Sequence, residues 1–213
     1  SLSGQKEILG LWLGDAESSK FWMNVLSDLK SRGANDVLIF CVDGLSGLCD
    51  SIKSIYPKSD VQECIVHQIR NCSKYVPHSE KKEFCADMKP IYKAVNEEAA
   101  LKALEEFEKK WEEKYPHAVA SWYKKWDRLS TFFKYPPDIR KIIYTTNPIE
   151  SYNSGIKRIT KTKLSFKTED SLIKLIYLVT QNLEKKWDTQ IRNWGLTFNQ
   201  LMVYFKDRIP ENY

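Results

Sequence analysis

Apolar and polar residues follow two different periods along the first third of the chain. The continuous apolar run at 37–42 (VLIFCV), which ends at Asp43-Gly44, is typical of a strand buried on both faces of a sheet. On either side of this run, apolar residues at helical spacing predict two helices, and shorter apolar segments predict two further strands. Such an alternation predicts a parallel, layered α/β sheet. The expected elements are a strand at 6–13, a helix at 18–31, the strand at 37–42, a helix at 45–56 and a strand at 61–67.

The pattern changes after Arg70, where strand signals give way to helical ones. Apolar residues at 99–111 recur at helical spacing among Glu and Lys, and aromatic residues are dense up to Phe133. We therefore expect a helical insertion whose aromatic residues form its own core, with stacking on unpaired bases as the alternative.

Prolines mark the elements in the rest of the chain. Pro136-Pro137 interrupts the pattern, Asn147-Pro148 is a good helix start, and 171–186 carries apolar residues on one helical face. The predicted organisation is a first core part at 1–70, an all-helical insertion at 71–135 and a second core part at 136–213.

Composition narrows the class of protein. An apolar fraction of 42% is ample for a packed core, and no apolar run reaches the roughly 18 to 20 residues that cross a bilayer. The five cysteines form an odd set, which argues against a disulfide framework. Because the N-terminus also lacks an export signal, we expect a soluble, cytoplasmic protein with no membrane partner.

Charge is unevenly distributed along the chain. Up to His67 there are six basic and nine acidic residues, a net charge of −3, so the remainder must carry +8 to give the overall +5. Between Ser151 and Thr168 the charged residues are all basic, interleaved with hydroxyl and amide side chains that also contact phosphate. This basic track indicates DNA binding, although a solvated helix face explains it too. Its members are Lys157, Arg158, Lys161, Lys163 and Lys167.

Two acidic residues are candidates for metal binding. Asp43 directly follows the buried strand, at the carboxyl edge where parallel sheets bind ligands. Glu150 falls in the first turn of an expected helix, and its helical row continues through Lys157 and Lys161. The alternatives are a turn or helix cap for Asp43 and, for Glu150, a first-turn glutamate favoured by the helix dipole.

Cys64 and His67 form a CxxH pair that invites a zinc interpretation. A closed zinc site normally needs four ligands, and the sequence offers no second CxxC or HxxxH pair. We therefore expect a structural or supporting role for His67 rather than a zinc site.

Several blocks of the sequence resemble the Mutator-type transposases of bacterial insertion sequences, and the resemblance covers essentially the full length. The order and spacing of these blocks are more specific than any single motif. They are ILGLWLG, FWMNVLSDLKSRG, VLIFCVDGLSG, CIVHQIRN, WDRLSTFFKYPPDIRKIIYTTNPIESYNSGIKR and the closing FKDRI.

The resemblance implies a ribonuclease-H-like fold, a mixed sheet flanked by helices and interrupted by an all-helical insertion. It also implies an Asp, Asp, Glu triad, in which Asp43 matches the second aspartate and Glu150 the glutamate. The Cys64 and His67 pair matches a family signature. The family's first aspartate lies on a strand upstream of 6–13, so we expect this chain to be truncated at its N-terminal strands and to lack that ligand.

The expected function is metal-dependent DNA strand cleavage and strand transfer in transposition. Mg²⁺ (or Mn²⁺) would be the cofactor, transposon ends and target DNA the partners, and a homodimer or higher homo-oligomer the assembly. With one ligand missing, the chain alone is expected to bind metal weakly and to be inactive. Three alternatives stay open: another ribonuclease-H-like nuclease or integrase, a domesticated or decayed DNA-binding or assembly module, and a helical interaction protein without a nucleic-acid role.

Overall fold

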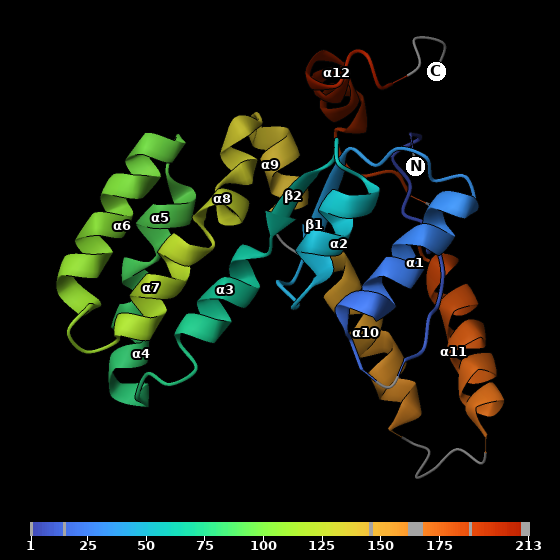
Figure 1. The fold of residues 1–213 in the computed structure, drawn as a ribbon, viewed down its shortest axis with the longest axis horizontal. Coiled ribbons are helices and arrows are strands. Elements are labelled where there is room, and N and C mark those ends of the chain that lie inside the picture. The colour runs from blue at the N-terminus through green and yellow to red at the C-terminus, as the bar shows by residue number, and fades with distance from the viewer. Residues whose placement is uncertain (1, 15, 145–146, 162–167, 188, 210–213) are drawn as a thin grey trace.

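A small parallel sheet lies between two groups of helices in the computed structural model of the chain (Figure 1). The structure describes residues 2–14, 16–144, 147–161, 168–187 and 189–209, with the backbone alone at 147, 148 and 169. The fold is therefore mixed α/β and mostly helical, as expected in class. Its elements are α1 (Ser19–Ser31), β1 (Ile39–Val42), α2 (Leu48–Ile55), β2 (Asp60–Glu63), α3 (Ile65–Cys72), α4 (His78–Asp87), α5 (Lys89–Lys93), α6 (Glu97–Trp111), α7 (Pro116–Lys124), α8 (Trp126–Leu129), the 3₁₀ helix η1 (Thr131–Lys134), α9 (Pro137–Ile143), α10 (Asn147–Thr160), α11 (Glu169–Glu184) and α12 (Trp194–Tyr204).

The two strands pair in parallel, and α2 is the crossover between them. Their register runs from Ile39 opposite Asp60 to Val42 opposite Glu63. The apolar run therefore forms the predicted strand β1, and α1 and α2 pack on each other beside it. A small core joins these elements. Its buried members are Leu26, Val42, Leu48, Cys49, Ile52, Tyr56 and Val61.

The predicted strand at 6–13 is wrong in the described structure. The segment has no strand partner there, and its Ile8 amide donates instead to Glu184 Oε1 of α11 at 3.0 Å. Leu9 and Leu13 remain 52% and 40% exposed. A strand needs a neighbouring backbone for its ladder of hydrogen bonds, and the side of a helix offers only side chains.

The predicted strand at 61–67 is half right. β2 ends at Glu63, the Cys64 amide donates to the Val42 carbonyl at 2.7 Å, and α3 begins at Ile65. A short apolar run does not distinguish strand from helix, and here Ile65 and Ile69 stand one helical turn apart on the side that packs inward. His67 consequently lies on a helix.

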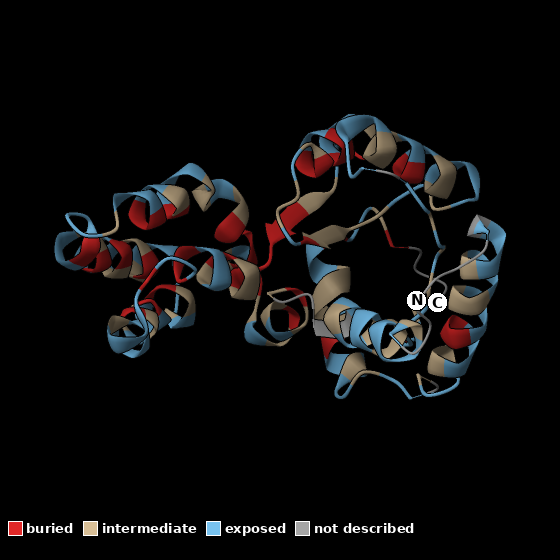
Figure 2. Ribbon diagram, turned by 90° about the horizontal axis from the view of Figure 1, so that it is seen from below, coloured by how far each residue is buried: buried red, intermediate tan, exposed pale blue. Residues whose placement is uncertain are grey.

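The segment from α4 to η1, the predicted insertion, is helical, and its aromatic residues pack on one another in a core that continues into α3, α9 and the C-terminal segment through Ile65, Ile139 and Phe205. Phe84 is fully buried, with ring centroids of Phe107, Trp111 and Tyr115 at 5.1, 5.1 and 5.3 Å. Trp122 is also buried. In Figure 2 the buried residues line the inner sides of these helices, while the outer sides are exposed.

The helical insertion is joined to the sheet along the outer edge of β2. The fully buried Gln62 donates from Nε2 to the Leu129 carbonyl at 3.0 Å and accepts the Phe132 amide on Oε1 at 2.6 Å. Thr131 Oγ1 donates to the Val61 carbonyl at 2.8 Å. These bonds satisfy the Val61 carbonyl of β2 and two backbone groups of α8 and η1, the Leu129 carbonyl and the Phe132 amide.

The helix predicted to begin at Asn147 is confirmed as α10, and the helix predicted at 171–186 corresponds to α11. The two helices approach closely because Gly155 faces Leu183, where an added Cβ would meet a methyl group at 3.0 Å. Tyr152 and Thr180 share a hydroxyl hydrogen bond of 2.6 Å across the same interface. Within the described ranges, the helices are all too short or too polar to cross a bilayer.

Candidate active site

Helix α3 begins beside the strand end that precedes Asp43, and its side chains contact Glu150. Asp43 follows the last residue of β1 and is exposed. The hydrogen bond from the Cys64 amide to the Val42 carbonyl fixes the start of α3 beside this strand end. The Ile65 amide donates to the Tyr144 carbonyl at 3.2 Å, which ties the same helix end to the segment leading into α10.

Two side chains of α3 contact the carboxylate of Glu150. Arg70 binds both carboxylate oxygens, through Nη1 to Oε1 and through Nη2 to Oε2 at 3.3 Å. His67 Nε2 lies 3.5 Å from Oε1. His67 and Arg70 are three residues apart, so they stand on one face of the helix. The structure thus brings Glu150 and His67 together and adds Arg70.

The Arg70 guanidinium holds the pKa of the Glu150 carboxyl below its ordinary value of 4.5, and partial burial opposes this effect. A bidentate Arg–carboxylate pair favours the charged form of both groups. The same contact raises the pKa of Arg70. Glu150 is therefore a carboxylate at neutral pH, with its charge already compensated.

The Arg70–Glu150 pair predicts a defined pH dependence of stability. Since folding lowers the pKa of Glu150, the pair stabilises the fold above about pH 4.5, and this contribution is lost as pH falls through the lower folded-state pKa. Replacing Arg70 with glutamine should cost about 1 kcal/mol or less at pH 7, because the pair is partly exposed. The cost should disappear once the pH falls below the lowered folded-state pKa of Glu150, as measured by urea unfolding across pH.

Arg158→Gln is the matched control for this prediction, since it removes an exposed arginine from the same region of the chain. Its effect on the free energy of unfolding should not follow the titration of Glu150. An Arg70→Gln cost that stays constant from pH 3 to pH 7 would contradict the pairing.

The two residues of the CxxH pair lie in different surroundings. Cys64 is buried at the end of β2, whereas the half-buried His67 points to Glu150. In the part of the chain that the structure describes, His, Cys, Asp and Glu side chains form no group of three or more that could hold a metal ion. The structure places the imidazole of His67 next to the carboxylate of Glu150.

The described part of the basic track lies at the end of α10, with Lys157 and Arg158 in its last turn and Lys161 directly after it. Lys157, Arg158 and Lys161 are exposed, and Lys157 and Lys161 fall on the helical row of Glu150. Lys163 and Lys167 lie outside the described residues. The arrangement places a carboxylate and two exposed cations along one side of a helix.

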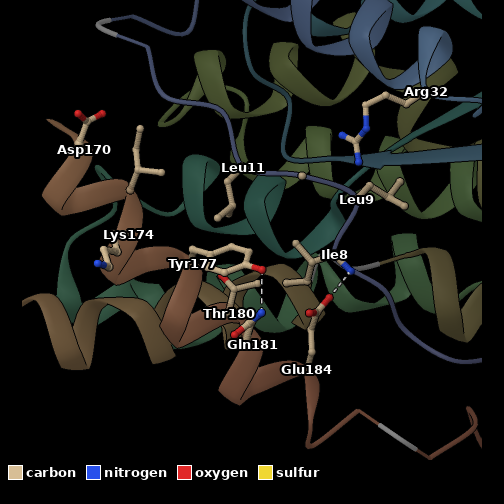
Figure 3. Close-up of a pocket in the computed structure, with 12 residues that line it drawn as sticks. Ile8, Leu9, Leu11, Arg32, Asp170, Lys174, Tyr177, Thr180, Gln181 and Glu184 are labelled. Carbon is tan, nitrogen blue, oxygen red and sulfur yellow. Dashed lines mark hydrogen bonds between the residues drawn. The ribbon is translucent and has the colours of Figure 1, made fainter.

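A separate hollow lies between the 8–11 segment and α11 (Figure 3). Ile8 and Leu11 face Tyr177 across it, and Glu184 closes one side through its bond to the Ile8 amide. Neither of the candidate carboxylates lines this hollow. We therefore assign the candidate site to α3 and its surroundings.

Sequence reasoning missed Arg70 and the buried Glu63. Arg70 stands one turn after His67, but this signal was hidden because the segment suited a strand. Glu63 ends β2 and pairs with Lys125 at 2.9 Å and Arg128 at 2.8 Å, more than 60 residues away in the chain. Local patterns carry no trace of such a distant pairing.

Comparison with known proteins identifies the family to which the chain belongs. Residues 1–190 match the family model described as "Transposase, Mutator family". The chain is 42% identical over 206 residues to a probable transposase for insertion sequence element ISRM3-like of Sinorhizobium fredii, and 41% identical to the transposase for ISRM3 of Rhizobium meliloti. Each alignment covers 96% of this chain and 52% of the relative. A probable transposase of Corynebacterium diphtheriae is 34% identical over 99% of the chain and 67% of its own length.

Proposed function

The chain belongs to the Mutator family of transposases, and from this premise we propose that it is part of a catalytic core for DNA strand cleavage and strand transfer. It spans about half the length of the first two relatives, so the activity of a whole transposase is part of the proposal. A ribonuclease-H-like arrangement, in which β1 and β2 belong to a larger mixed sheet, is the fold that we propose for the complete core.

The observation that carries the proposal is the position of α3. This helix starts beside the strand end that bears Asp43, and its His67 and Arg70 hold Glu150. Two acidic residues more than 100 positions apart are thus connected through one short helix. Structural ion pairs also join distant segments, and the family membership favours the functional interpretation.

Mg²⁺ (or Mn²⁺) is the proposed cofactor, with Asp43 and Glu150 among its ligands. Carboxylate oxygens suit these hard ions, which would activate the attacking oxygen and stabilise the leaving one. The described residues fit such a site only incompletely, since they hold no three-residue ligand group and Arg70 already binds both oxygens of Glu150. The chain alone is therefore expected to bind the ions weakly and to cleave no DNA.

The roles of the chain's own residues follow from their chemistry. His67 and Arg70 orient the Glu150 carboxylate and keep it ionised. The exposed cations of α10 contact the DNA backbone and position it without reading its sequence. A partner copy of the chain would bring the second transposon end, so we propose a homodimer or higher homo-oligomer.

Mn²⁺ binding to the 213-residue chain tests the metal proposal. We expect a dissociation constant of about 10⁻⁴–10⁻³ M, as in weak carboxylate sites, measured by water-proton relaxation. Asp43→Asn and Glu150→Gln should each weaken binding at least about tenfold. Asp50→Asn, which neutralises another exposed aspartate nearby in the sequence, should change nothing.

Equal Mn²⁺ affinity in the wild-type chain and its three variants would contradict the assignment of Asp43 and Glu150 as metal ligands. A labelled duplex incubated with the chain and Mg²⁺ or Mn²⁺ should stay intact. Nicking by this polypeptide, lost in Asp43→Asn, would show that the site is complete and overturn the expected inactivity.

One alternative is favoured by a specific observation. The Arg70 guanidinium neutralises Glu150, as it would in a DNA-binding or assembly module that has no metal chemistry. In that case the wild-type chain would bind Mn²⁺ no more tightly than the Asp43→Asn and Glu150→Gln variants do. Its salt-sensitive binding of DNA would persist.

A further inference from the structure

A buried ion cluster lies directly behind the Asp43-Gly44 turn. Glu63, whose side chain is 4% exposed, ends β2; its Oε2 accepts a hydrogen bond from Lys125 Nζ at 2.9 Å, and its Oε1 forms an ion pair with Arg128 Nε at 2.8 Å. Cys49 of α2 adds a weak thiol contact to Oε1 at 3.9 Å. The two cations come from the junction of α7 and α8.

The ion cluster lies directly against Gly44 of the turn. Its φ is +80°, and a Cβ built on it would lie 2.8 Å from Glu63 Oε2 and 3.0 Å from Lys125 Nζ. A residue with a side chain would therefore displace the ion pair as well as strain the backbone. The ammonium of Lys125 thus lies immediately beside the backbone of the residue that follows Asp43.

The charges of the cluster do not balance. One buried carboxylate needs one cation to compensate it, and Glu63 has two, which leaves one positive charge in the cluster beside the exposed carboxylate of Asp43. Both cations also keep access to solvent, with side chains 25% and 31% exposed, and Lys125 lines a hollow between α3 and α7. Lysine and arginine have several donors each, so a second acceptor can bind without breaking the contact to Glu63.

We propose that Lys125 and Arg128 bind a phosphate of the DNA backbone beside the Asp43 turn, and that Glu63 holds them in place. The inference rests on the proposed function, because it assumes that DNA approaches Asp43. A phosphate near an exposed aspartate is repelled by it, and a surplus cation at hydrogen-bonding reach offsets that repulsion. This phosphate site is separate from the basic track of α10.

The test is the affinity of the 213-residue chain for a short fluorescent duplex, measured by anisotropy across a series of salt concentrations. Lys125→Gln should weaken binding about five- to tenfold near 0.1 M salt and reduce the salt slope by about 1. Lys124→Gln makes the same charge change at the adjacent exposed lysine and should weaken binding less than about twofold. Lys125→Arg keeps the charge and should retain the wild-type affinity.

Arg128→Gln is the second variant, because it leaves Lys125 paired with Glu63 and should show a similar loss. Thermal unfolding of each variant confirms that it is folded at the temperature of the measurement. Equal losses for Lys125→Gln and Lys124→Gln would overturn this site while leaving the proposed function intact. If the wild-type chain shows no salt-sensitive DNA binding, both this phosphate site and the DNA-binding role of α10 are overturned. The metal ligands are tested separately, by the Mn²⁺ measurement.

Discussion

Replacing Phe84 with alanine is expected to lower the free energy of unfolding by about 3–5 kcal/mol. The ring is fully buried and makes edge contacts with three other aromatic rings of the insertion. The substitution therefore removes both the buried apolar area and the aromatic contacts, and leaves a cavity that rigid neighbouring rings fill poorly. Urea unfolding should show a lower midpoint with an unchanged slope.

Tyr75→Ala is the control for this prediction, since its ring is 80% exposed. Its effect should stay within about 0.5 kcal/mol, as for most surface substitutions. A Phe84→Ala cost below about 1 kcal/mol would mean that the insertion is not packed around this ring. In that case the unfolding transition followed by tryptophan fluorescence would also be nearly the same in Phe84→Ala and in the wild-type chain.

Gln62→Leu is the second substitution with a large expected effect, a loss of about 2–5 kcal/mol. Leucine fills a similar volume but leaves the Leu129 carbonyl and the Phe132 amide without their partner in a buried place. Each unsatisfied buried group costs about 1–3 kcal/mol. The free energy of unfolding from urea titration measures the loss.

Hydrogen exchange locates the same effect. The Phe132 amide is held by Gln62, so it should exchange faster in Gln62→Leu than amides within the insertion core. Gln181→Leu makes the same chemical change on the exposed side of α11 and should be nearly neutral. A stable Gln62→Leu protein with unchanged exchange at Phe132 would refute the proposed attachment of the insertion to β2.

Much of the fold could be predicted from periodicity, and the errors have a common cause. β1 and the long helices have apolar positions whose spacing is set within the element itself, so the sequence is enough to identify them. The segment at 6–13 has an apolar pattern that suits a strand, but a strand also needs a backbone partner that a local pattern cannot specify. At 61–67 the run was too short to separate the last residues of β2 from the first turn of α3.

The candidate site was predictable only in part, for a similar reason. The exposed position of Asp43 and the polar row of Glu150 follow from where each stands in its own element. Their contacts with α3 depend on tertiary packing, so Arg70 could not be identified as the partner of Glu150. The same holds for Glu63, whose two cations become neighbours only when the insertion folds against β2.

Helix α3 has a second face, and it leads into the insertion. Gln68 Nε2 donates to Ser121 Oγ of α7 at 2.7 Å, while Arg70, two residues on, binds Glu150. The same eight-residue helix therefore bonds to α7 through one side chain and to the Glu150 carboxylate through another. The geometry around Glu150 thus depends on the far helices as well as on its own helix.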